Sequence, residues 1–255
     1  MNIKQSKTAT IMNCVRFLSV TVFICFFILI LAGSADKAEA QRTGIGFSGG
    51  MNVSSHLNNF RFAGDDFELD FAPEAKVGFQ GGFIYRAPLT QHLRFQAEPS
   101  AILLGATYDD TFTLRGFDFQ SVSETQLLYV QLPLLMQLTT VPSEEIVFGR
   151  PRARTTFHMT GGVFGGYLLD AQFSGHNSGA PIGIEFQGSF SNDVLDQYSE
   201  FDGGVILGAG LERGANYKVG FETRVIFSVI SSGDQPEINF NPHNMGVTFG
   251  LYFLL

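Results

Sequence analysis

Apolar and polar residues alternate with a period of two through most of the chain after residue 40. The stretch 93–103 shows this most clearly, because Leu93, Phe95 and Ala97 alternate with Arg94, Gln96 and Glu98. No segment there repeats its apolar residues at the spacing of an amphipathic helix. Alternation of this kind is typical of β-strands that have one apolar and one polar face. We predict eight strands, at about 45–53, 77–86, 93–103, 128–138, 155–171, 204–211, 217–229 and 244–255.

The connections between these strands alternate in length. Short connections at 88–92 and 213–216 contrast with long ones at 55–74 and 172–200, and the stretches after the third and seventh strands are also long. The connection at 140–154 is longer than this scheme expects. Short turns on one side and long loops on the other are typical of outer-membrane β-barrels, which also have an even number of strands. The sequence therefore predicts an all-β protein, an eight-stranded antiparallel up-and-down transmembrane β-barrel with both ends in the periplasm.

The polar faces of the strands carry charges that we expect inside such a barrel. In a membrane barrel the apolar face meets lipid and the polar face points inward. An eight-stranded barrel is just wide enough for side chains to fill it, so opposite charges would pair there. The alternative is the solvated face of a soluble sheet. The predicted interior polar network consists of Arg94, Gln96, Glu98, Glu212, Lys218, Glu222 and Arg224.

The N-terminus has the features of an export signal. Basic residues precede an apolar run from Phe17 to Leu31, and a cleavage motif, Ala38-Glu39-Ala40, follows it. These are the parts of a secretory signal peptide; a single membrane anchor is the alternative reading of the same run. We expect residues 1–40 to be a cleavable signal peptide and residues 41–255 to be the barrel domain.

Composition and charge exclude several other classes of protein. Charged residues are 16% of the chain, with 29 Gly and 27 Phe but no Trp. Both of the two cysteines lie before residue 41, so the exported chain would form no disulfide. Cleavage after Ala40 removes four of the 16 basic and two of the 24 acidic residues, which leaves a net charge of −10. This net charge argues against nucleic acid as a partner, because binding to it relies on basic side chains.

Six stretches of the chain resemble, in the right order, the PorT-like outer-membrane β-barrel family of Gram-negative bacteria. They are GIGFSGGMNVS at 44–54, GFQGGF at 78–83, LRFQAEP at 93–99, LYVQLPLL at 128–135, GGVFGGYLL at 161–169 and GAGLE at 208–212. The resemblance covers nearly all of residues 41–255. It implies an eight-stranded barrel in the outer membrane, and some members are similar to envelope assembly or secretion factors. It brings no catalytic residues.

The end of the chain departs from the usual barrel pattern. Outer-membrane barrels generally end in an aromatic residue read by the insertion machinery, whereas this chain ends in Leu255 and has Phe253 two residues earlier. We expect the C-terminal strand to be recognised by that machinery, and outer-membrane lipid and periplasmic or secretion-system proteins to be the other partners.

Residues suited to catalysis or metal binding are few. His176 and Ser178 form the single His-x-Ser pair, in a predicted glycine-rich loop that would not hold them together. Acidic residues cluster at 65–70 without the spacing of a calcium loop. No Cys/His set has zinc spacing. We therefore expect no catalytic site, no metal and no cofactor.

The expected function is that of a non-enzymatic outer-membrane barrel with an interior filled by side chains. Its role would be structural, in surface contact, or in envelope assembly or secretion. Two alternatives remain open at this point: a narrow channel for ions or small solutes, and a lipid-modifying enzyme of the outer membrane.

Overall fold

The computed structural model describes residues 43–57, 60–64, 67–114, 117–140, 144–147, 150–179, 186–214, 217–233 and 242–255. The predicted signal peptide lies outside these residues and stays a prediction. Apart from one 3₁₀ turn, η2 (Leu195–Gln197), the regular structure of the described residues is β-strand. None of their helical segments has the length and apolar character needed to cross a membrane.

The strands of the unit Thr43–Leu255 pair antiparallel throughout. Their bounds are β1 (Gly44–His56), β2 (Phe60–Gly64), β3 (Phe67–Phe71), β4 (Pro73–Pro88), β5 (Leu93–Ala97), β6 (Ser100–Leu114), β7 (Phe117–Thr139), β8 (Glu144–Val147), β9 (Arg150–Gly179), β10 (Phe186–Asp193), β11 (Phe201–Gly214), β12 (Lys218–Ser228) and β13 (Asn244–Leu254).

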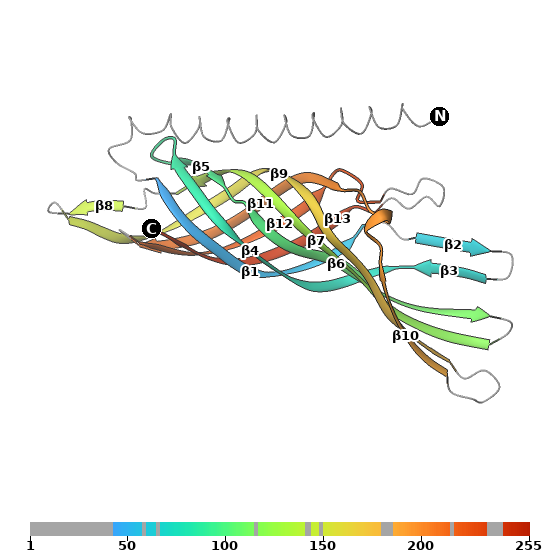
Figure 1. The fold of residues 1–255 in the computed structure, drawn as a ribbon. Coiled ribbons are helices and arrows are strands. Elements are labelled where there is room, and N and C mark those ends of the chain that lie inside the picture. The colour runs from blue at the N-terminus through green and yellow to red at the C-terminus, as the bar shows by residue number, and fades with distance from the viewer. Residues whose placement is uncertain are drawn as a thin grey trace, which may run out of the picture. The chain divides into compact units, whose positions relative to one another are not determined.

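The main sheet closes into a ring (Figure 1). Going round it, β1 is followed by β4, β5 with β6, β7, β9, β11, β12 and β13, and β13 pairs with β1 again. The path through the sheet has ten strands rather than the predicted eight. One reason is that the predicted third strand is interrupted at Glu98 and Pro99, and proline has no amide hydrogen for the ladder. The other is β10, which adds to β9 in a stretch for which the sequence indicated a loop.

One end of the ring carries both termini of the barrel, and we call it the terminus end; the other is the loop end. At the loop end the strands run on into stretches predicted as loops. β6 and β7 remain paired as far as Leu114 and Phe117, and β9 continues to Gly179. These long hairpins project together in Figure 1, beside the β2–β3 hairpin. At the terminus end, the unexpectedly long connection at 140–154 contains β8, which pairs with the start of β9.

Alternation sorts the side chains of the ring strands into an outward apolar face and an inward face that is largely polar. Phe83 is 71% exposed and points outward, whereas Arg94 is 2% exposed and lies inside. Exposed apolar side chains of this kind occur at seven of the eight positions of the ring; examples are Phe47, Phe79, Leu138, Met159, Leu207, Val225 and Leu251. On β5 with β6, the outward side chains of Leu93, Phe95 and Leu103 are half-buried. A soluble barrel would have the opposite arrangement, because apolar residues there fill the inside.

The interior has two layers. The loop half contains an apolar cluster built from inward residues of the ring strands, among them Ile102, Leu127, Tyr129, Ile206 and Ile226. The terminus half contains buried charged and amide side chains.

The segment around η2 completes the apolar layer from the loop end. Val194 and Tyr198 flank η2, and both are buried against the apolar cluster. The amide of Val194 donates to Ala171 O, and that of Ser199 donates to Ser232 O. Burial raises the pKa of Tyr198 to about 12, since an ionised phenolate would lose its hydration there.

Candidate functional site

The candidate site is the interior polar network of the terminus half, made of Ser48, Arg86, Arg94, Gln96, Glu98, Glu212, Glu222, Arg224 and Tyr252. Strand geometry places these side chains inside, because residues two apart point to the same face. Arg94, Gln96 and Glu98 follow one another at that spacing, and so do Glu222 and Arg224. Each of these two stretches thus contributes a short row of inward polar side chains rather than a single charge.

Glu212 holds two arginines at once. Its Oε2 accepts from Arg86 Nη1 at 2.6 Å, and its Oε1 accepts from Arg94 Nη1 at 2.6 Å. The hydroxyl of Tyr252 donates to the same Oε2 at 3.1 Å, and the Arg86 guanidinium lies over the Tyr252 ring, 4.9 Å from its centroid. Glu212 has no solvent exposure. Both of its oxygens are therefore used within the protein.

Glu98 and Arg224 form the second centre of the network. Arg224 Nη2 donates to Glu98 Oε2 at 2.7 Å and to Glu222 Oε2 at 3.0 Å. Ser48 Oγ donates to Glu98 Oε1 at 2.6 Å. Gln96 joins the two centres, because it donates to Glu98 Oε2 at 2.9 Å and accepts from Arg86 Nε at 2.8 Å.

The strongest contacts of the network cross the barrel. Arg86 on β4 and Glu212 on β11 are four places apart in the ring of eight positions formed by β1, β4, β5 with β6, β7, β9, β11, β12 and β13. Glu98, between β5 and β6, and Arg224 on β12 are four places apart as well. These pairs are diametrically opposed, so each one spans the lumen.

The charges of the network balance. Three arginines face three glutamates, and all six side chains are buried. A buried charge needs a partner and further hydrogen bonds to be tolerated, and here each has at least one partner. Chemically, the arrangement is suited to bracing and filling the lumen. No group of His, Cys, Asp and Glu that would hold a metal ion occurs in the described part of the chain.

Six of the seven residues named from the sequence lie in this network, and Lys218 lies beside it. Lys218 is half-buried at the terminus end of β12, opposite Gly214 and Leu254. Arg94 is paired with Glu212 rather than with Glu98, its neighbour along the strand.

Sequence reasoning missed Ser48, Arg86 and Tyr252 as members of the network. Each of the three alternates with outward-facing residues of its strand and so has the inward phase. This phase is the signal in the sequence that could have identified them.

Glycine makes room for the large inward side chains. A Cβ on Gly210 would lie 2.7 Å from the His158 ring, and one on Gly208 would lie 2.8 Å from Cγ of Arg224. A Cβ on Gly220 would overlap the Tyr252 ring. Side chains at these positions would displace the network.

His176 and His158 lie in different surroundings. His176 and Ser178 lie on the extension of β9, so the prediction of a flexible loop around them was wrong. His176 contacts Ser189 Oγ on β10, at 3.2 Å, in a solvent-exposed position. His158 is buried, with Nε2 3.6 Å from Glu222 Oε2. Of the acidic cluster, Asp65 and Asp66 lie outside the described residues.

Comparison with known families identifies the barrel. A family model described as outer membrane protein beta-barrel domain matches residues 35–233. The chain belongs to this family. Its exposed apolar strand faces agree with the outer-membrane location that membership indicates. Comparison with curated proteins finds no match.

Among solved structures, the chain is similar to Ail, the attachment invasion locus protein of Yersinia pestis. Two Ail structures have 9% and 12% sequence identity and a TM-score of 0.33, over 84% of this chain and all of Ail. The NanC porin has 10% identity and a TM-score of 0.16, over 83% of this chain and all of the porin. Scores this low carry no information on function.

Proposed function

We propose that this protein is a PorT-like outer-membrane β-barrel with eight membrane-spanning strands and a lumen closed to solutes. It acts through its surfaces, in a structural, surface-contact or envelope assembly and secretion role, and not through catalysis. The observation that carries the proposal is the filled interior. A layer of charged side chains, whose charges sum to zero, lies next to an apolar layer.

The register of the ladders supports the count of eight spans. β5 and β6 both pair with β4 on one side and with β7 on the other. In both ladders the register is the same before and after Glu98 and Pro99. The amide of Glu98 still donates to Pro133 O, and that of Phe83 to Pro99 O. β5 and β6 therefore cross as one strand. β10 pairs with the polar extension of β9 beyond the apolar band, so it does not cross.

Closure of the lumen follows from what its two layers contain. Ions passing the terminus half would have to break contacts of 2.6–3.0 Å between buried charges. In the loop half they would meet the apolar cluster and the η2 segment, which offer no replacement for their hydration, and the Asp202 carboxylate there already accepts hydrogen bonds from Ser228 and Asn244.

The C-terminal strand fits recognition by the insertion machinery. On β13, Phe253 is stacked on Tyr217, with ring centroids 5.9 Å apart, and also contacts Phe47 at 5.6 Å. The chain thus presents an aromatic patch at the terminus end even though its last residue is Leu255.

Conductance in planar bilayers tests the closed lumen. The folded protein is expected to give no stable single-channel steps, and Glu124→Gln, a change on the exposed surface of the loop end, is expected to behave identically. Regular steps that change in size with Arg94→Ala would overturn the proposal and favour the narrow channel. Hydrolysis of lipid A or phospholipid that is lost in Ser178→Ala would overturn the non-enzymatic part.

A further inference from the structure

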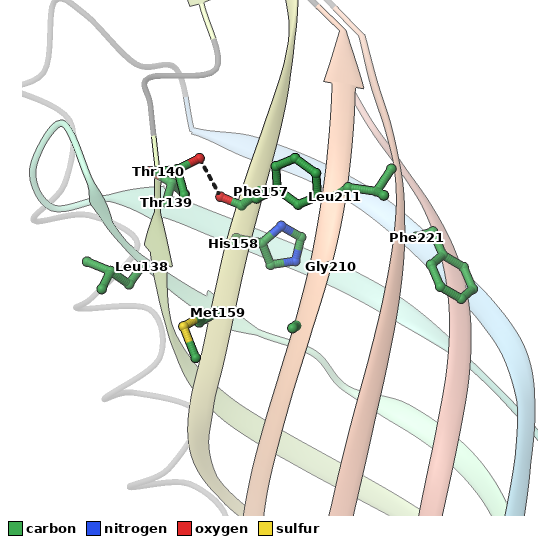
Figure 2. A pocket seen from close by; sticks show the side chains of 10 residues that line it. Leu138, Thr139, Thr140, Phe157, His158, Met159, Gly210, Leu211 and Phe221 are labelled. Carbon is green, nitrogen blue, oxygen red and sulfur yellow. Dashed lines mark hydrogen bonds between the residues drawn. The ribbon is translucent and has the colours of Figure 1, made fainter.

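The outward face of the barrel has an apolar groove at the terminus end. It has a volume of about 430 Å³ and crosses four neighbouring strands, β7, β9, β11 and β12. Figure 2 shows the side chains around it. Met159, Ala209, Leu211 and Phe221 are among them.

The groove exists because a small residue stands among large ones on the lipid-facing surface. Ala209 lies between Leu207 and Leu211 along β11, and it is paired with Met159 on β9. Alanine does not reach as far outward as these neighbours, so the surface is hollowed at this point. The walls are apolar, and the only polar contact drawn in Figure 2 is at the edge, where Thr140 Oγ1 donates to Phe157 O at 3.3 Å.

One exposed arginine lies at the end of the groove that is nearer the rim. Arg213 follows Leu211 by two residues and so lies on the same outward face, ~7 Å further along the strand. Arg154 is also exposed, but it is opposite Gly214 and has the inward phase of Thr156 and His158 on β9, so it is not on the face of the groove. The other lysine and arginine side chains whose burial is described are buried or half-buried.

We propose that this groove binds an anionic phospholipid of the membrane leaflet at the terminus end. One acyl chain lies along Met159, Ala209 and Leu211, and the lipid phosphate is bound by Arg213. The order of the chemistry along β11, apolar groove first and guanidinium at the rim, matches the order of acyl chain and phosphate in a phospholipid. Guanidinium is well suited to phosphate because it donates two parallel hydrogen bonds.

A second copy of the chain is a poorer occupant of the same groove. A symmetric contact would bring Arg213 of both copies to one interface, and like charges facing each other oppose association. Phosphate neutralises this arginine instead.

The absence of tryptophan from the chain gives a direct test. Phe221→Trp places a single fluorophore in the groove, and Phe83→Trp places one on β4, which is not among the groove strands. Each protein is reconstituted in two kinds of vesicle, both of which contain phosphatidylglycerol and phosphatidylcholine. In one kind only the phosphatidylglycerol is brominated, and in the other only the phosphatidylcholine. Bromine quenches tryptophan on contact, so the ratio of quenching reports which lipid occupies the site.

At Phe221→Trp we expect phosphatidylglycerol to be preferred by about fivefold, which is the contribution of one arginine that contacts the phosphate. Phe83→Trp is expected to show no preference. Addition of Arg213→Gln to Phe221→Trp should lower the preference about fivefold, whereas Arg213→Lys should retain most of it. High salt should weaken it, because exposed charges are screened.

Filling the groove tests the acyl-chain part. Ala209→Leu should reduce quenching at Phe221→Trp, and Ala101→Leu, an equal change at an exposed alanine on β6, should not. Equal quenching by both lipids at Phe221→Trp would overturn the proposal. It would also be overturned if Ala209→Leu had no effect, or if cross-linking showed the groove covered by a second copy.

Discussion

Replacing Glu212 with glutamine should destabilise the barrel more than any other single loss of charge in the network. Glu212 is fully buried and compensates two buried arginines through its two oxygens, each at 2.6 Å. Glu212→Gln keeps the size of the side chain but leaves Arg86 and Arg94 to share one neutral amide. Removing one partner of a buried ion pair typically costs about 3–5 kcal/mol, so we expect a loss of at least about 3 kcal/mol in the free energy of unfolding. The folded state of a domain is worth only about 5–15 kcal/mol.

The assay is urea unfolding of the protein in lipid vesicles, followed by far-ultraviolet circular dichroism. The control is Glu74→Gln, which removes an exposed charge at the loop end of β4; a loss below about 1 kcal/mol is expected there. The double variant Glu212→Gln/Arg94→Met restores the balance of charge and should be more stable than Glu212→Gln alone. If Glu212→Gln unfolds like Glu74→Gln, or if the double variant shows simple additivity, the network does not hold the barrel as argued.

Three further predictions concern packing, hydrogen bonding and pH. Gly220→Val should lower the free energy of unfolding by about 1–3 kcal/mol or more, because it displaces the Tyr252 ring. Gly81→Ala, whose Cβ would have its nearest contact at 3.7 Å, should be tolerated. Equal urea midpoints for the two variants would contradict this. Asp202→Asn should lower the free energy of unfolding by about 1–3 kcal/mol, because the buried carboxylate accepts hydrogen bonds from Ser228, Asn244 and a backbone amide. Thermal unfolding measures this loss of stability. Stability should fall as the pH rises from about 10 to about 12, because unfolding lowers the pKa of Tyr198 from about 12 to its ordinary value. Urea titrations of Tyr198→Phe should show a shallower fall, and an unchanged slope would refute the assignment.

The alternation predicted the ring strands because lipid imposes it. Each position facing acyl chains is apolar, so Phe47, Phe83 and Phe227 mark their strands in the sequence. The hairpins at the loop end lack this constraint. Ser174 and His176 lie on a strand whose residues are polar on both sides, and such a stretch looks like a loop. Backbone pairing with β7 makes it a strand nonetheless.

The membership of the interior network was also largely visible in the sequence, but its pairing was not. Phase along the strand shows that Arg94 and Glu212 point inward. It does not show that they meet, because that depends on which strands lie opposite in the closed ring. The η2 segment was missed for a related reason: Val194 and Tyr198 enter the apolar layer from a connection without periodicity, and only the assembled barrel gives them neighbours.

The pairs that cross the barrel bear on the order in which the protein assembles. Before β1 meets β13, Arg86 and Glu212 belong to distant parts of an open sheet, as do Glu98 and Arg224. In that state their charges would face acyl chains or trapped water, and an open sheet edge does not survive in hydrocarbon. Strands added to the membrane one at a time would bear this penalty at every step. Insertion and ring closure are therefore expected to occur as a single concerted event, in which the ion pairs form when β1 pairs with β13.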